Sequence, residues 1–221
     1  MFQIKICGIT SAADAVAAVE AGADALGLNF YPQSSRFISR DLAREIAAAV
    51  GDRVCKVGLF VNSPAEEIIA AYDDLGLNLV QLHGDEQPDL LRRLNPRPVM
   101  KAFRIGPDGL APLRRWFDEG MRGGLIPQLT LLDAFQAGSY GGTGKTTDWP
   151  TAAAYAATRG VPPCVLAGGL TAENVAAAIA AVRPAAVDVA GGVESRPGVK
   201  DAAKMQAFVA AAKNALKSAV S

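Results

Sequence analysis

Eight short apolar segments alternate with amphipathic segments from one end of the chain to the other, and this alternation limits the possible folds more than any other feature. The apolar segments have the near-continuous apolar character of buried parallel strands, and the segments between them have helical spacing. Eight units in 221 residues average about 28 residues each, which suits a strand followed by a helix. The strands are expected at residues 3–7, 25–30, 55–61, 79–83, 99–104, 129–134, 164–167 and 186–190.

Capping residues indicate where several helices begin and end. Ser11 is placed to cap the first helix, and Gly22 is placed to end it. Residues 63–66 read Ser-Pro-Ala-Glu and match a capping box with Ser63 at the N-cap. Thr171 is expected to cap the seventh helix, whose apolar residues recur at helical spacing.

Each strand has one apolar face and one face that becomes polar toward its carboxyl end. Lys5 and Cys7 share the polar face of the first strand, and Asp188 stands between two valines in the eighth. We therefore expect an α/β protein with a single-domain (β/α)8 barrel, the TIM barrel, over residues 1–221. An open doubly wound sheet is the alternative, but it requires a reversal of strand order, and no break in the alternation marks one.

The charge balance and the cysteines exclude several classes of function. Lysine plus arginine and aspartate plus glutamate both number 22, so no basic excess favours nucleic acid. No apolar run reaches the roughly 20 residues of a membrane span, and the first residues do not resemble a signal peptide. Cys7, Cys55 and Cys164 are too far apart for a disulfide framework or a metal cluster. We expect a cytoplasmic protein without metal that binds a small molecule.

Two glycine pairs follow the last two strands and predict a phosphate site. Gly168 and Gly169 come after the seventh strand, and Gly191 and Gly192 come after the eighth. Paired glycines let backbone amides approach an anion closely, and phosphate binds at these two loops in many barrels. The alternative is that the glycines only form tight turns.

A third glycine-rich segment, at residues 141–146, follows the sixth strand. It resembles a nucleotide-binding P-loop, but Ser139 stands where the Walker A spacing requires glycine. We interpret the segment as a loop that closes over a substrate, with Gly142 and Gly144 in contact with it.

Single ionisable residues end several strands and are candidates for catalysis. Cys7 ends the first strand, Asp133 the sixth and Asp188 the eighth, while Arg36 lies in the loop after the second. A cysteine can act as a base and an aspartate as an acid. Each of them alone fits a structural role at least as well. His83, the single histidine, is interpreted as structural, and the alternative is that it lines the barrel mouth.

Several sequence strings resemble the phosphoribosylanthranilate isomerase family, in the same order and over essentially the whole chain. The most specific are KICGIT at 5–10 and QLHGDE at 81–86. The others are NFYP at 29–32, LD at 132–133, GGTG at 141–144, LAGGL at 166–170, GVES at 192–195 and GVKD at 198–201.

The resemblance implies an isomerase of tryptophan biosynthesis that works without a cofactor. It converts N-(5-phosphoribosyl)anthranilate to the 1-deoxyribulose 5-phosphate isomer by an Amadori rearrangement. By this resemblance Asp133 is the general acid and Cys7 the general base. Arg36 pairs with the anthranilate carboxylate, and Asp188 bonds a ribose hydroxyl. A monomer is expected rather than a homodimer.

Two further expectations concern the strand faces and the loops. Cys7 needs help to become a thiolate, and Lys5 points to the same face. Lys5 and Asp188 are expected to pair, because the first and eighth strands become neighbours when the barrel closes.

The chain departs from the family pattern at Ala190, where serines are common, and at Thr147, where an aromatic residue is common.

Related functions remain as alternatives. Indole-glycerol-phosphate synthase requires a catalytic Lys–Glu pair that we cannot place in this sequence. The isomerase that serves both histidine and tryptophan pathways has an aspartate where this chain has Cys7. An inactive phosphate-binding relative is the remaining alternative, and the Cys7–Asp133 combination argues against it.

Overall fold

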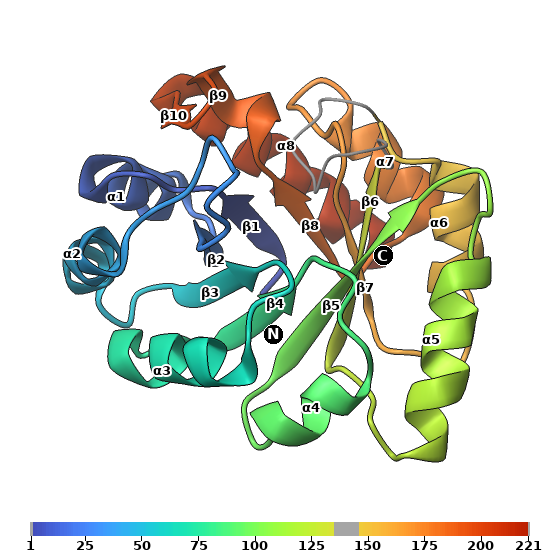
Figure 1. Ribbon diagram of the computed structural model, residues 1–221. Coiled ribbons are helices and arrows are strands. Elements are labelled where there is room, and N and C mark those ends of the chain that lie inside the picture. The colour runs from blue at the N-terminus through green and yellow to red at the C-terminus, as the bar shows by residue number, and fades with distance from the viewer. Residues whose placement is uncertain (1, 135–145, 221) are drawn as a thin grey trace.

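The computed structural model describes residues 2–134 and 146–220, and its main strands form one closed barrel (Figure 1). The strands run parallel in the order of the chain, and β1 pairs with both β2 and β8. The (β/α)8 prediction is therefore confirmed. The strands are β1 (Ile4–Cys7), β2 (Ala25–Asn29), β3 (Cys55–Phe60), β4 (Leu79–Leu82), β5 (Val99–Ile105), β6 (Leu129–Ala134), β7 (Cys164–Leu166) and β8 (Ala186–Val189).

Helices surround this barrel on the outside (Figure 1). They are α1 (Ala12–Ala21), α2 (Arg40–Val50), α3 (Ala65–Leu75), α4 (Asp89–Leu94), α5 (Ala111–Arg122), α6 (Trp149–Ala156), α7 (Val175–Val182) and α8 (Ala202–Val220). Within the described residues, none of these helices has the length and apolar character needed to cross a membrane.

A short segment after β8 was not predicted. It contains the 3-10 helix η1 (Gly191–Val193) and a small antiparallel hairpin of β9 (Glu194–Arg196) and β10 (Val199–Lys200). Figure 1 shows this hairpin beside α1, and the Lys200 amide donates to Asp14 of α1 at 3.2 Å. The hairpin therefore covers the carboxyl side of the barrel next to β1.

The predicted cap of α1 is confirmed, whereas two other predicted caps are wrong. Ser11 Oγ accepts from the Asp14 amide at 3.0 Å, and Gly22 ends α1 with φ 92°. Pro64, not Ser63, is the N-cap of α3, because its extended backbone at ψ 147° delays the helix to Ala65.

The helix expected to begin at Thr171 starts later. The side chain of Asn174 accepts from the Thr171 amide at 2.8 Å and closes a turn there. Asn174 is consequently the N-cap, and α7 begins at Val175. The apolar spacing was nevertheless interpreted correctly, since Val175, Ala178, Ile179 and Val182 are all buried.

The core has two layers that follow from the alternation along each strand. Ile4 and Ile6 of β1 belong to the outer layer, between the barrel and its helices. The barrel interior is filled by small and medium apolar residues such as Met100, Leu131 and Val165. Lys5, on the opposite face of β1 from the two isoleucines, is fully buried inside the barrel.

Candidate active site

The predicted site residues meet at the carboxyl ends of the strands. Cys7, Asp133 and Asp188 end or nearly end β1, β6 and β8, and all three are buried. Arg36 reaches this rim from the loop after β2, where its side chain covers Gly8. Residues 142 and 144 lie outside the described part of the chain.

Lys5, Cys7 and Asp188 form one cluster at the seam between β1 and β8. Lys5 is paired with Asp188 across the seam, and Lys5 Nζ lies 2.9 Å from Asp188 Oδ1. This confirms the predicted ion pair. Cys7, two residues further along β1, interacts with Lys5 through its side chain.

Burial and charge oppose one another in this cluster. Burial lowers the pKa of Lys5, but the Asp188 and Cys7 charges outweigh it and raise that pKa above its ordinary value. Burial raises the pKa of the Cys7 thiol, and Lys5 counteracts this only in part. Without a bound ligand, Cys7 is therefore held mainly as the thiol.

Arg36 is held by a carboxylate that the sequence analysis did not single out. Glu194 accepts from Nε and from Nη2 of Arg36, both at 2.7 Å. Glu194 also accepts from Lys200 Nζ at 2.8 Å, so one buried carboxylate joins two cations. Burial raises the pKa of Glu194, but the two cations outweigh it and hold the pKa below its usual range.

Asp133 has different neighbours, on the side of the rim formed by β4 to β7. Asp133 Oδ1 accepts from the Ala134 amide at 2.7 Å, and Oδ2 lies 3.3 Å from His83 Nε2. His83 Nδ1 is in turn 3.3 Å from Gln81 Nε2. His83 thus lies inside the barrel next to the candidate acid, which agrees with the less favoured interpretation, that it lines the barrel mouth.

The glycine pairs lie where the loops after β7 and β8 approach their neighbours closely. A Cβ atom on Gly168 would stand 2.1 Å from Thr147 Oγ1 and 2.9 Å from Asp133 Oδ1. A Cβ atom on Gly192 would stand 1.9 Å from the Leu170 carbonyl oxygen. Only glycine fits these two positions, and the two loops therefore pack directly against each other at the rim.

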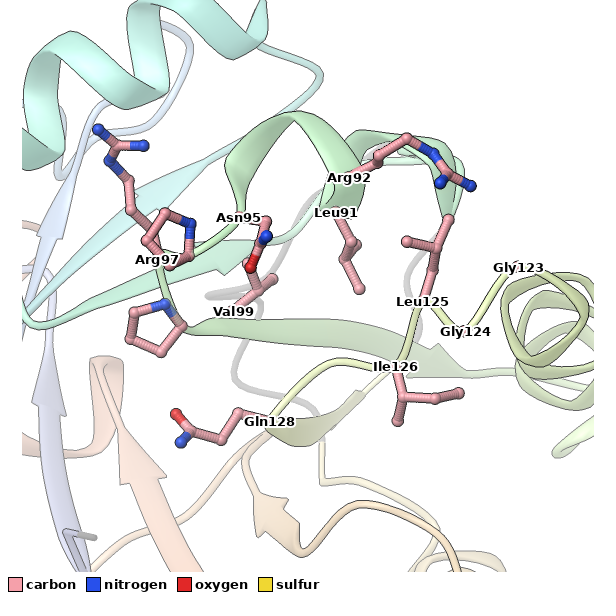
Figure 2. Close-up of a pocket in the computed structure, with 12 residues that line it drawn as sticks. Leu91, Arg92, Asn95, Arg97, Val99, Gly123, Gly124, Leu125, Ile126 and Gln128 are labelled. Carbon is pink, nitrogen blue, oxygen red and sulfur yellow. The ribbon is translucent and has the colours of Figure 1, made fainter.

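A cavity of about 520 Å³ lies at the other end of the barrel (Figure 2). Asn95 lines it just before β5, and Gln128 lines it just before β6. Arg97, also on its wall, is paired with Asp73. Because catalysis in (β/α)8 barrels takes place at the carboxyl ends of the strands, this cavity is not the candidate active site.

Among residues 2–134 and 146–220, no group of three or more histidine, cysteine, aspartate or glutamate side chains is arranged to hold a metal ion. The described rim instead carries a carboxyl group and a thiol, which are groups able to transfer protons, and the Arg36 guanidinium group, which is able to bind an anion.

The fold and the position of these residues place the chain among the (β/α)8-barrel enzymes. The family described as N-(5'-phosphoribosyl)anthranilate (PRA) isomerase matches residues 4–211. The N-(5'-phosphoribosyl)anthranilate isomerase of Trichlorobacter lovleyi is 50% identical over 98% of this chain and 100% of its own length. The chain belongs to this isomerase family.

Solved structures agree with that assignment. The phosphoribosyl anthranilate isomerase of Thermotoga maritima superimposes with a TM-score of 0.83 at 40% identity, over 97% of this chain and 100% of its own. A second structure contains the enzyme with reduced 1-(o-carboxyphenylamino)-1-deoxyribulose 5-phosphate. It superimposes with a TM-score of 0.80 at 39% identity, over 97% of this chain and 100% of its own.

Proposed function

We propose that this chain isomerises N-(5'-phosphoribosyl)anthranilate in tryptophan biosynthesis, with Asp133 as general acid and Cys7 as general base. The observation that supports this best is the placement of the two groups at one rim, on strands separated by β7 and β8. An acid and a base that come from separate walls can act on neighbouring atoms of one sugar held between them.

The acid acts first. Asp133 donates its proton to the ring oxygen as the bond from that oxygen to C1′ breaks, and the furanose opens to a Schiff base. The hydrogen bond from the Ala134 amide to Oδ1 supports this role, because it fixes the orientation of the carboxyl group. Its other oxygen, Oδ2, faces His83.

The base completes the rearrangement. The Cys7 thiolate takes the proton from C2′, and the electron pair of that bond neutralises the iminium group to give an enolamine. The enolamine becomes the ketone when its 2′-hydroxyl loses a proton and C1′ gains one. Substrate and product contain the same atoms, so the reaction needs no external oxidant or reductant.

Two charged groups beside Cys7 are proposed to hold the substrate. Arg36 pairs with the anthranilate carboxylate, and Glu194 supports this by bonding Nε and Nη2 and thereby setting the plane of the guanidinium group. Asp188 accepts from a ribose hydroxyl. Both groups lie on the β1 side of the rim, which would orient the sugar with C2′ toward Cys7.

The phosphate is proposed to bind against Gly168, Gly169, Gly191 and Gly192. Gly191 gives the clearest test. Among the described residues, a Cβ atom there would meet only Arg36 Nη2, at 3.5 Å, so Gly191→Ala should fold normally. We expect KM and the inhibition constant of inorganic phosphate to rise roughly tenfold with kcat little changed, because the added methyl group would keep the phosphate away from the backbone amides, and a charged hydrogen bond is worth about 1.5–3 kcal/mol. Unchanged phosphate inhibition would place the phosphate elsewhere.

The isomerase assay itself tests the whole proposal. Loss of the fluorescence of phosphoribosylanthranilate should follow addition of the purified protein, with and without a metal chelator. Turnover in the chelator supports an acid–base mechanism carried by side chains. A folded protein without turnover is the result expected of an inactive relative, and it would refute the proposed function.

The cellular compartment is proposed from the thiols. Cys7, Cys55 and Cys164 are all free in the structure. A reduced thiol that serves as a base requires a reducing environment, so we infer that the enzyme works in the cytoplasm. The binding partner that we propose for the enzyme is its small phosphorylated substrate.

A further inference from the structure

Lys5 is a buried cation whose role the proposed mechanism does not explain. Its side chain is fully inside the barrel, and Nζ lies 2.9 Å from Asp188 Oδ1. Burying an ammonium group costs free energy of folding, and pairing it with a carboxylate need not offset that cost in full. An apolar pair at these two positions would close the same seam between β1 and β8, so the charges themselves call for an explanation.

The space that Lys5 shares with Cys7 points to that explanation. Gly27 of β2 is paired with Cys7 across the sheet. A Cβ atom on Gly27 would lie 2.5 Å from Cys7 Sγ and 3.0 Å from Lys5 Nζ. The thiol and the ammonium group therefore converge on one space, which exists because residue 27 has no side chain.

Four charged groups act on the Cys7 thiol, and they differ in sign. Burial is the largest influence and raises the pKa of Cys7. The Lys5 charge opposes burial most strongly, and Lys200 and Arg36 add further positive charge around the thiol. The Asp188 carboxylate acts in the other direction and favours the neutral thiol.

We propose that Lys5 is the positioning residue that makes Cys7 usable as a base, and that Asp188 controls how much of the Lys5 charge reaches the thiol. In the free protein Lys5 is shared between Asp188 and Cys7. When a sugar hydroxyl donates to Asp188, the carboxylate is engaged by substrate, and Lys5 then stabilises the thiolate as the thiol proton passes to solvent. The base is thus formed where and when the sugar binds.

This inference rests on the proposed role of Cys7, and its test uses a readout that does not require turnover. The rate at which iodoacetamide alkylates Cys7 is measured against pH by mass spectrometry, because only the thiolate reacts. Cys164 serves as an internal reference for unfolding, since it is buried and burial raises its pKa to about 12.

The variants are chosen to give opposite shifts. Lys5→Met should move the midpoint of Cys7 alkylation to higher pH by about one unit or more, and Asp188→Asn should move it to lower pH. The double variant Lys5→Met/Asp188→Asn carries no unpaired buried charge, and its midpoint should still lie above that of wild type. Lys5→Arg keeps the positive charge, so its alkylation midpoint should lie close to that of wild type.

Lys101 provides the matched control. It is also a buried lysine in an ion pair, 3.1 Å from Glu86, but it lies on the helix side of β5. Lys101→Met should lower the thermal midpoint without moving the alkylation midpoint of Cys7. A shift as large as that of Lys5→Met would mean that loosening of the barrel, not charge, is responsible.

The outcomes separate the two proposals. If folded Lys5→Met and the double variant both alkylate at the wild-type midpoint, Lys5 only neutralises Asp188 and the inference is wrong. If the midpoints shift as expected but Cys7→Ser retains full turnover, the coupling is real and another residue is the base. If the pKa of Cys7 that shows in the pH profile of kcat/KM shifts in parallel with the alkylation midpoints, both proposals are supported.

Discussion

A buried cysteine and a buried aspartate at a barrel rim can serve the fold or the reaction, and kinetics separate these roles. Cys7→Ser replaces a thiol with a much weaker acid, and Asp133→Asn keeps hydrogen bonding but cannot deliver a proton. We expect each to reduce kcat by roughly 10²–10⁴-fold with a smaller effect on KM, because each group is proposed to move a proton in the transition state. Near-normal kcat together with a lowered unfolding midpoint would mean a structural role.

Arg36 is expected to act on binding instead. Arg36→Ala should weaken substrate binding by about 1.5–3 kcal/mol, the range for a lost charge-assisted hydrogen bond. A substrate analogue without the anthranilate carboxylate supplies the control, because it should bind wild type and variant equally. If the analogue still distinguishes the two proteins, Arg36 does not contact the carboxylate.

The residues also show which contacts a sequence can predict. The Lys5–Asp188 pair was predictable, since both residues face away from apolar neighbours and the barrel closes their strands together. Glu194 was not, because its partner Arg36 is 158 residues away and neither residue lies in the main sheet. Its only signal was its place in the family string at 192–195. The described contact between His83 and Asp133 likewise depends on barrel geometry.

At the scale of elements, apolar runs predicted the strands more accurately than caps predicted the helices. All eight expected strands lie within one residue of their observed ends, because burial on both faces makes each run continuous. Helix starts depend on the backbone angles of single residues, and Pro64 and Asn174 overrode the expected caps. The β9–β10 hairpin escaped notice because strands of two or three residues have no measurable alternation.

The β9–β10 hairpin is held in place by interactions that depend on the charge of Glu194. The Glu194 side chain joins Arg36 to Lys200, and the Glu194 carbonyl oxygen accepts from Lys204 of α8 at 2.8 Å. Because the pKa of Glu194 in the folded protein lies below its ordinary value of 4.5, this carboxylate stabilises the fold above about pH 4.5. The stabilisation is lost as the pH falls through the folded-state pKa.

Glu194→Gln should therefore be less stable than wild type at neutral pH, by about 1–3 kcal/mol, and the difference should shrink as the pH falls. Urea unfolding at several pH values between 3 and 7 measures this, within ranges where both proteins fold. Glu45→Gln, at an exposed position of α2, is the control and should run parallel to wild type. A stability difference that stays constant with pH would contradict a role for the ionised carboxylate.

For the whole molecule, the candidate site lies where the ends of the chain meet. Lys5 and Cys7 belong to the first strand, Asp188 to the last, and Glu194 to the hairpin that follows it. The Lys5–Asp188 pair joins residues 183 positions apart. Cys7, its neighbouring charges and the carboxylate that holds Arg36 therefore come together only when β8 closes against β1, so the proposed chemistry requires the closed barrel.

The surface of the barrel bears on its oligomeric state. Among the described residues, the large apolar side chains that are exposed are Phe37, Met121 and Ile126, at 44%, 57% and 44%. A stable dimer buries about 800 Å² on each partner, usually over a core of contiguous apolar residues. Phe37 lies in the loop after β2 at the candidate active site, whereas Ile126 lines the cavity at the other end (Figure 2).

Because these exposed side chains are split between two ends of the barrel, we expect a monomer, although one Thermotoga maritima relative is described as dimeric. Light scattering on a sizing column should give a mass near 22.9 kDa that does not change with protein concentration. A mass twice as large would contradict the prediction. In that case Ile126→Asp and Phe37→Asp would locate the interface, since a buried unpaired charge at its core should dissociate the dimer, and a charge away from it should leave the mass unchanged.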